Sequence, residues 1–466
     1  MNLKAVTPLG AALIVTFGCS LALLLENLYL FGYHLDLESA AFLGNYLADR
    51  SLPELVFDPA RNDWKLYQAR ELSYFFDCFD ARFIGWSIRH GWYQFYTLSG
   101  FLMLTAAVFV QQYGIRTLYP KLPGWIATLF SFAYVLTPCV AGNGFFRSSK
   151  YGCALTFTIA VFLTFALFRG RFRRWKWKVA GIAAALLGAT LFDRQGAFFA
   201  AAYASAAGFF LLLTLWNRFP PLSADARRIL CSVTAAALAV VLAGTFYNLV
   251  IGPKLIYACN GYVPDFSYQN MSGLPPEVLP FGGRFLFRNI GYSLAGVTGF
   301  ASTLAGSAAA AALLALLFFG GLKLRNRTIL LAAAAFAAAL AGCWGAAAGM
   351  VGRHPAVLVP AVMFSLYFLP GWSLLLPFFA PAAETVRKLG WKVNPVGFML
   401  TVTAAVHLGG YLLLYRVNPV IEHQRAYQEA MPAFRRALAD PGYDWRRDRL
   451  PVRLQFLIEL FRSQPK

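Results

Sequence analysis

Carboxylates gather in one stretch of the chain, Tyr33–Gly91, which separates two apolar runs and is rich in aromatic residues. It holds nine of the 21 Asp and Glu residues: Asp36, Glu38, Asp49, Glu54, Asp58, Asp63, Glu71, Asp77 and Asp80. A carboxylate held beside a membrane can take a proton from a hydroxyl group, as a general base does in a group-transfer reaction. Closest to the end of the first apolar run are Asp36 and Glu38. These two are therefore predicted to be catalytic, with four alternatives: Asp63, Glu71, Asp77 and Asp80.

A second set combines residues of the acidic stretch with charged residues at the ends of other apolar runs that are not explained by chain orientation. A charged side chain near the hydrocarbon of a membrane costs free energy unless it is paired with an opposite charge or hydrated. The planar guanidinium group of Arg matches the geometry of phosphate oxygens. We therefore expect a substrate site for an anionic ligand. The expected members are Asp63, Arg70, Glu71, Asp77, Arg147, Lys150, Asp193, Arg194, Arg284, Arg288, Arg353 and His354. The alternative is that these cations only form salt bridges with the acidic stretch or extend toward the membrane surface.

The elements that position these residues are membrane helices. Of the 466 residues, 59% are hydrophobic and 13% charged, against about 25% charged in a soluble domain. Runs of roughly 20 apolar residues can each cross a bilayer core of about 30 Å. We expect an all-α polytopic membrane protein with a domain over 1–415 and about 11 transmembrane helices. These are placed at 8–31, 92–111, 124–140, 151–168, 179–192, 197–216, 229–251, 302–322, 329–350, 356–379 and 394–415.

The net charge of +20 is distributed as a topology signal. Much of it sits in short loops between apolar runs, and the densest group lies at 169–178, which favours a cytoplasmic position for those loops and for the N-terminus. This distribution argues against a nucleic-acid partner. It places the loops 32–91 and 252–300 outside, together with the tail 416–466. The tail has ten Lys and Arg residues, but the rule is weaker for long segments.

Several segments outside the crossings are also predicted to be helical. Apolar residues at three- and four-residue spacing over Trp64–Ile88 favour a helix lying flat on the membrane. The segment 282–300 is expected to be a shallow helix, and the tail a small helical cap with an amphipathic helix at 452–461. Cys78 and Cys259 fall in the predicted outer loops, where they are able to pair, although spacing alone does not establish a disulfide.

Three short motifs carry a resemblance to a known family. They are Tyr33-His34-Leu35-Asp36-Leu37-Glu38 after the first run, the tight charged hairpin Asp193-Arg194-Gln195-Gly196, and Gly352-Arg353-His354-Pro355. With the long first outer loop, this arrangement resembles the GT-C superfamily of membrane glycosyltransferases. The resemblance covers the first ten predicted crossings. Unlike typical members, this chain has no adjacent pair of acids after the first crossing, because Leu37 separates Asp36 from Glu38.

The resemblance implies an activity and a location. Members transfer a sugar from a polyprenyl-phosphate-linked donor to a glycan, lipid or protein acceptor at the outer face of the membrane. They use an acid of the first loop as base, and some bind a divalent metal there, Mg or Mn. The partners implied are the lipid-linked donor, the acceptor and membrane lipids. The location implied is a bacterial inner (plasma) membrane, with the active face periplasmic or extracellular.

Three other readings compete with this one. A lipid-linked glycan flippase or transporter would need polar or broken helices at mid-membrane and often two similar halves, whereas the predicted crossings are apolar at their centres. An O-antigen ligase or polymerase is similar in size and substrate but carries its large outer loop late in the chain. A non-catalytic membrane partner is compatible with the same composition.

Overall fold

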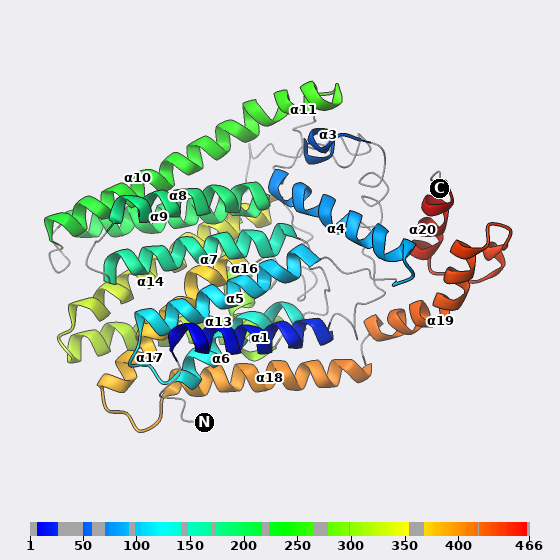
Figure 1. Ribbon diagram of the computed structural model, residues 1–466. Helices are drawn as coiled ribbons and strands as arrows, with labels where there is room; N and C mark the ends of the chain where they lie inside the picture. Colours follow the sequence, from blue (N-terminus) through cyan, green and yellow to red (C-terminus); the bar gives the residue numbers. More distant parts are fainter. Residues whose placement is uncertain are drawn as a thin grey trace.

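The computed structural model describes residues 7–26, 50–57, 70–92, 98–140, 148–169, 174–216, 223–263, 278–297, 299–353, 368–417 and 419–463. Within these ranges all regular secondary structure is helical and no strand occurs. Figure 1 shows long helices with similar axis directions, and a smaller group of helices beyond one end of them. The all-α fold class predicted from the sequence is confirmed.

The bundle is built from long helices. They are α1 (Pro8–Glu26), α5 (Leu98–Leu118), α6 (Gly124–Val140), α7 (Ser148–Arg169), α8 (Trp175–Phe192), α9 (Arg194–Leu215), α10 (Ala224–Phe246), α13 (Gly299–Lys323), α14 (Arg327–Arg353) and α18 (Pro395–Val417). The other elements are α3 (Leu52–Phe57), α4 (Glu71–Arg89), η3 (Tyr247–Ile251), α11 (Gly252–Asn260), α12 (Val278–Ala295), α16 (Leu369–Leu375), η6 (Leu376–Phe378), α17 (Phe379–Lys388), α19 (Pro419–Ala439), η7 (Trp445–Arg447) and α20 (Val452–Ser463).

Six helical segments are long and apolar enough to cross a membrane. They are Leu98–Leu118, Ser148–Phe168, Gln195–Leu215, Ala224–Asn260, Gly299–Lys323 and Arg327–Met350. Shorter apolar helical segments lie at Pro8–Leu21, Gly124–Tyr134 and Pro395–His407. By length and composition the chain is a membrane protein, and the count of eleven crossings stays a prediction.

Several boundaries differ from those predicted. The crossing expected at 92–111 is found as α5, Leu98–Leu118. The crossing expected at 229–251 is part of a longer helical run, because α10 continues through the π-helical turn η3 into α11. The crossing expected at 356–379 begins outside the described residues, and its helical part continues from Leu369 to Lys388. Pro377, which has no N–H to donate, sits in the 3₁₀ turn η6 that joins α16 to α17.

The helix ends that adjoin the short basic connections lie together at one end of the bundle, at the left in Figure 1. They are the facing ends of α5 and α6, of α7 and α8, of α9 and α10, of α13 and α14, and of α17 and α18. The Lys and Arg residues of these connections and of the adjoining helix ends include Arg116, Lys121, Arg174, Arg227, Arg325, Lys388 and Lys392. We call this the basic end and the opposite end, where α4 lies, the α4 end. The arrangement is the one that the positive-inside rule requires of loops on a single side.

Helix α12 lies across the α4 end. A Cβ atom on Gly282 would be 2.6 Å from the backbone of Ala348, near the end of α14, and one on Gly291 would be 1.8 Å from the carbonyl oxygen of Ser302, at the start of α13. Both neighbours lie at the α4 end, so α12 crosses this end instead of running the length of the bundle. Only glycine permits these backbones to approach so closely. The helix expected at 282–300 is found at Val278–Ala295, and its shallow position in a membrane stays a prediction.

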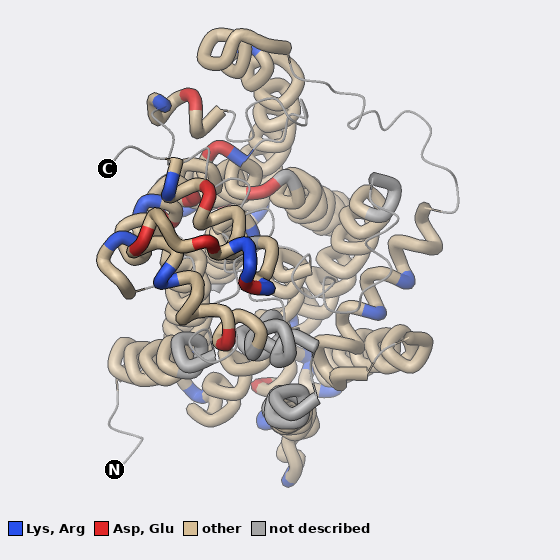
Figure 2. The backbone as a smooth tube through the Cα atoms, turned by 90° about the vertical axis from the view of Figure 1, so that its right-hand side faces the viewer, with Lys and Arg blue, Asp and Glu red and all other residues tan. Residues whose placement is uncertain are grey.

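The C-terminal helices pack on α4. Cys78, Ile84 and Ile88 of α4 form a hydrophobic cluster with residues of α19 and α20 such as Phe434 and Leu457. Figure 2 looks onto this end and shows acidic and basic residues gathered over part of it. The amphipathic helix predicted at 452–461 is confirmed as α20. One face of α4 is thus buried by the tail, whereas Phe79 and Trp86 on its other side are exposed, and a position flat on the membrane stays a prediction.

The first turns of α4 also touch the bundle. Leu72 and Phe76 pack against its hydrophobic core, and the ring of Phe76 stacks on that of Phe192 at the end of α8, with centroids 5.7 Å apart. The predicted helix Trp64–Ile88 is thus found as α4 from Glu71, while 64–69 lie outside the described residues. Helix α4 therefore links the bundle to the C-terminal group.

A candidate active site at the α4 end

The hairpin between α8 and α9 is as tight as its sequence predicts. Asp193 is the only residue between the two helices, and its Oδ1 accepts a hydrogen bond of 2.8 Å from the backbone N–H of Gln195, which caps α9. Gly196 then passes very close to α8, because a Cβ atom there would lie 1.9 Å from the carbonyl oxygen of Ala189. The hairpin fixes the Asp193 carboxylate at the end of the bundle.

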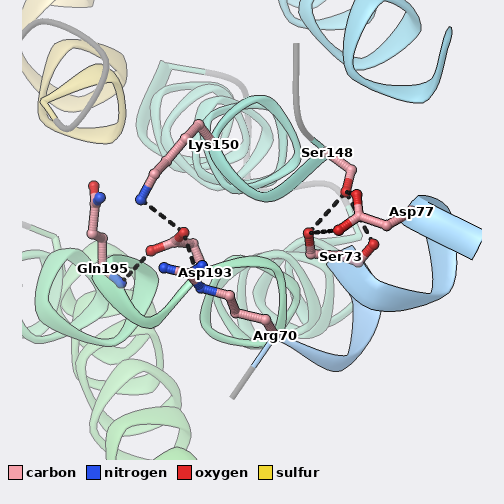
Figure 3. Close-up of polar contacts among 7 residues, drawn as sticks. All are labelled: Arg70, Ser73, Asp77, Ser148, Lys150, Asp193 and Gln195. Carbon is pink, nitrogen blue, oxygen red and sulfur yellow. Dashed lines mark hydrogen bonds and ion pairs between the residues drawn. The ribbon is translucent and has the colours of Figure 1, made fainter. Parts of the chain in front are cut away.

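Two cations converge on this carboxylate (Figure 3). Lys150, in the first turn of α7, donates from Nζ to Oδ2 of Asp193 at 2.8 Å, and Nε of Arg70 lies 3.6 Å from the same oxygen. The exposed fractions of the side chains are 1% for Asp193, 10% for Lys150 and 19% for Arg70. The pair of Lys150 with Asp193 is thus buried, and Arg70 is the member of this charge cluster that reaches furthest toward the surface.

The electrostatics of Asp193 follow from these contacts. Burial by itself would raise the pKa of its carboxyl, but the charges of Lys150 and Arg70 outweigh burial and lower that pKa to about 2. Asp193 is therefore ionised throughout the physiological range. Its stabilising contribution is present above the ordinary pKa of an aspartate and is lost only as the pH falls toward 2.

A second carboxylate joins α4 to α7. Oδ1 of Asp77 accepts a hydrogen bond of 3.0 Å from the hydroxyl of Ser148, the first residue of α7. The hydroxyls of Ser73 and Ser148 lie 2.9 Å apart, and all three side chains are buried. Figure 3 shows this group beside the charge cluster, with α7 supplying Ser148 to one and Lys150 to the other.

A third carboxylate joins α4 to α5. Oδ1 of Asp80 accepts a 2.9 Å hydrogen bond from the backbone N–H of Ser99, and its Oδ2 accepts one from the hydroxyl of the same residue. Burial raises the pKa of the Asp80 carboxyl to about 7; the bonds from Ser99 oppose this rise and the charge of Asp77 adds to it. Asp80 therefore exchanges its proton near neutral pH.

The three carboxylates share one structural role. Each binds the N-terminal end of a long helix: Asp80 that of α5, Asp77 that of α7 and Asp193 that of α9. Helix N-termini carry unsatisfied N–H groups and a partial positive charge, so negative groups are stabilised there. Asp77 and Asp80 fasten α4 onto the bundle directly, and Asp193 does so through its ion pair with Arg70, the residue before α4.

The raised pKa of Asp80 predicts a pH dependence of stability. Because the folded state holds this proton more tightly than the unfolded chain does, the contribution of Asp80 is most favourable at low pH and is lost as the pH rises through about 7. We expect Asp80→Asn, which cannot ionise, to lose less stability than the parent as the pH rises from the ordinary pKa of an aspartate to about 7. Thermal unfolding followed across pH measures this. Equal pH profiles for the two proteins would contradict the prediction, and Asp444→Asn at an exposed carboxylate is the control.

Apart from Arg194 and Arg353, the predicted site residues divide into three groups. Those that meet near the charge cluster are Arg70, Glu71, Asp77, Lys150 and Asp193, with Glu71 buried in the first turn of α4. Those outside the described residues are Asp36, Glu38, Asp63, Arg147 and His354. Those on α12 are Arg284, whose guanidinium lies 5.7 Å from the ring centre of Phe281, and Arg288. Helix α12 packs on α13 and α14, so the last two residues belong to a different part of the α4 end.

Arg194 and Arg353, both expected in the substrate site, can be placed by their backbones. In the contact between α9 and α14, Gly349 faces Phe198 and Gly342 faces Ala202. Continuing this antiparallel register by one turn brings Arg194, the first residue of α9, and Arg353, the last of α14, to the same end. Their side chains lie outside the described part of the structure, so a shared phosphate site for them stays a prediction.

Sequence reasoning missed the serines of this site. The hydroxyls of Ser73, Ser99 and Ser148 each donate a hydrogen bond to a carboxylate of α4. The available signal was a helix start, since Ser148 directly precedes a long apolar run. That signal indicates a cap but does not tell which distant carboxylate it meets.

The described residues contain no group of three His, Cys, Asp or Glu side chains arranged to hold a metal ion. The carboxylates that the resemblance implies for Mg or Mn, chiefly Asp36 and Glu38, lie outside those residues, so this expectation is untested.

Cys78 and Cys259, which the sequence left open as a pair, are both free thiols. Burial raises the pKa of the Cys78 thiol to about 12, so it is inert at neutral pH.

Searches against protein-family models, curated proteins and solved structures found no match to this chain.

Proposed function

We propose that this protein is a multi-pass membrane glycosyltransferase. It transfers a sugar from a polyprenyl-phosphate-linked donor to a glycan, lipid or protein acceptor, and its active face is the α4 end, on the outer side of a bacterial plasma membrane. The proposal combines the resemblance of the three motifs with the position of the charge cluster. The observation that carries most weight is that Arg70 extends from a buried Lys150–Asp193 pair at the end where the acidic stretch joins the bundle.

In the proposed reaction the acidic stretch supplies the base. Asp36, supported by Glu38, takes the proton of an acceptor hydroxyl, whose oxygen forms a bond to the anomeric carbon of the sugar. The bond from that carbon to the phosphate oxygen breaks, and polyprenyl phosphate leaves with the bonding electrons. Positive charge near the leaving phosphate lowers the barrier, because that is where negative charge develops.

Within this scheme the members of the charge cluster differ in role. Lys150 and Asp193 are paired with each other and buried, so we assign them to positioning the hairpin and α4. Arg70, with its larger exposed fraction, is the residue assigned to the phosphate of the donor. Arg194 and Arg353, at the same end, are further candidates for this contact.

The experiment that tests the proposal compares cells with and without the protein. Mass spectra of extracted lipids and surface glycans should show a lipid-linked sugar accumulating in the cells that lack it, together with loss of the same sugar from an acceptor. Purified protein in detergent should then transfer that sugar, which separates a transferase from a flippase, since a flippase needs two leaflets and makes no new bond. Unchanged lipids and glycans would contradict the proposal.

Topology gives a separate prediction. The basic loops at one end predict that the N-terminus and the loops at that end are cytoplasmic, and that 32–91 and 416–466 are outside. Single cysteines placed in a cysteine-free protein at residue 60 and in the loop at Lys121 should react oppositely with a membrane-impermeant thiol reagent. We expect residue 60 to be labelled in intact cells and the loop to be labelled only after lysis. The reverse pattern would exclude an outer active face.

A further inference from the structure

A cavity of about 510 Å³ lies inside the bundle near its basic end. It is bounded by α7, α9, α10, α14 and the run from α16 to α17. Its walls are chiefly alanine, leucine and phenylalanine side chains, among them Ala206, Ala335 and Phe378. Deep in the cavity, the hydroxyls of Thr164 and Tyr203 hydrogen-bond to each other. Because these polar groups are paired, this part of the wall presents mainly apolar surface to a bound molecule. The cavity therefore suits a hydrocarbon chain.

The mouth of the cavity is polar and basic. Glu384 and Lys388 of α17 line it, and Glu384 is bound by both basic neighbours, with its Oε1 2.9 Å from Nη2 of Arg387 and 3.7 Å from Nζ of Lys388. Asn326, also at the mouth, stands between Arg325 and Arg327. On α17, two cations pair with one carboxylate. Two further cations, Arg325 and Arg327, flank Asn326 at the start of α14. This is a surface for a negatively charged headgroup.

The depth of the cavity matches one membrane leaflet. Along α14 the lining runs from Thr328 at the mouth to Ala339, which at 1.5 Å per residue is about 16 Å. One half of the hydrocarbon core of a bilayer measures about 15 Å. A lipid whose headgroup lay level with Lys388 would thus have an acyl chain of the right length to reach Ala339.

We propose that this cavity binds one acyl chain of an anionic phospholipid, with the phosphate of the headgroup at Lys388. The site lies at the opposite end of the bundle from the proposed transfer reaction and does not depend on it. Its components are an apolar chamber, a mouth with excess positive charge and a depth of one leaflet. A binding site of this kind would hold α7, α9, α14 and α17 together from within.

The test uses photolabelling in lipid nanodiscs. The probe is a phosphatidylglycerol with a diazirine near the end of one acyl chain, and the matched probe is the same molecule with a phosphatidylcholine headgroup. After irradiation, adducts are mapped by mass spectrometry. We expect the phosphatidylglycerol probe to label the deep wall around Tyr203. Replacing Lys388 by Gln should reduce the preference for phosphatidylglycerol by about fivefold, the usual contribution of one basic residue near a membrane surface.

Variants that fill the cavity provide the decisive comparison. Ala335→Trp and, from the facing wall, Ala206→Phe should each abolish labelling of Tyr203, whereas Ala341→Trp, in a separate groove between α9 and α14, should not. Lys392→Gln, at the same end but outside the cavity, is the control for charge. Labelling confined to outward-facing residues such as Phe319, labelling unaffected by both filling variants, or equal labelling by the two lipids would each overturn the proposal. None of these readouts requires sugar transfer.

Discussion

Asp193→Asn is expected to lower the free energy of unfolding by about 3–5 kcal/mol, the usual cost of removing one partner of a buried ion pair. The amide keeps the size of the side chain and can still accept the hydrogen bond from Gln195 that caps α9. It cannot balance the charge of Lys150, whose ammonium would remain at the buried end of α7 without the carboxylate 2.8 Å away. The loss of unfolding free energy therefore measures the charge pairing with Lys150 and does not include the helix cap.

The measurement is unfolding in mixed micelles, titrated with sodium dodecyl sulfate and followed by tryptophan fluorescence. Lys150→Met should cost less than Asp193→Asn, because Asp193 would keep Arg70 and the Gln195 N–H as partners. The double variant should recover much of the loss, as expected when both charges are removed together. Asp444→Asn, whose partner Arg447 is largely exposed, should change stability little. A change in Asp193→Asn no larger than this control would show that the buried pair does not hold the hairpin.

The sequence predicted the hairpin but not its partners, for a physical reason. The hairpin is local, since an acid that caps a helix and a glycine that allows close approach stand within four residues. The bond from Lys150 to Asp193 joins residues 43 apart in the chain, and it depends on how α7 packs beside α8. Hydrophobic periodicity identifies each helix but does not fix the rotation of one against another. For the same reason, the bonds from α4 to Ser99 and Ser148 were not foreseeable.

The membrane helices were predictable because long apolar runs and clusters of Lys and Arg are strong signals. Boundaries were predicted less well where the chain stays helical beyond its apolar run. Helix α17 is an example. Its apolar face is buried, but it also contains Glu384 and Lys388 at the cavity mouth. A prediction based on apolar residues alone therefore places the end of this helix too early. The burial of α4 by the C-terminal helices joins residues more than 300 positions apart, and the sequence contains no local signal for such a contact.

The docking of α4 bears on where the base of the proposed reaction lies. Asp77 and Asp80 were possible bases by sequence, but both bind helix N-termini and are buried. Such carboxylates are engaged in holding the fold, so they are poorly placed to meet an acceptor hydroxyl. The other predicted bases are Glu71, which is buried in the first turn of α4, and Asp36, Glu38 and Asp63, which lie in the part of the stretch outside the described residues. Among these, Asp36 follows the first apolar run most closely and is thus nearest in sequence to the membrane surface.

Asp36→Asn is therefore expected to lower the rate of sugar transfer by about 10²–10⁴-fold, the usual effect of losing a general base, while leaving the protein folded. The amide is nearly the same size as the carboxylate but cannot accept the proton of the acceptor hydroxyl. Transfer from a lipid-linked sugar by purified protein measures the rate, and an unchanged unfolding transition shows that the fold survives.

Three further variants make the Asp36 result specific. Glu38→Gln should have a smaller effect if Glu38 only supports the base, and Asp63→Asn should have little. Asp77→Asn, by contrast, should reduce stability as well as transfer, because the loss of its bond to Ser148 loosens α4 from α7. A loss of transfer without a loss of stability thus separates a base from a residue that positions the acidic stretch. Full activity of Asp36→Asn would move the assignment to Glu38 and then to Asp63, the other predicted bases in the part of the stretch outside the described residues.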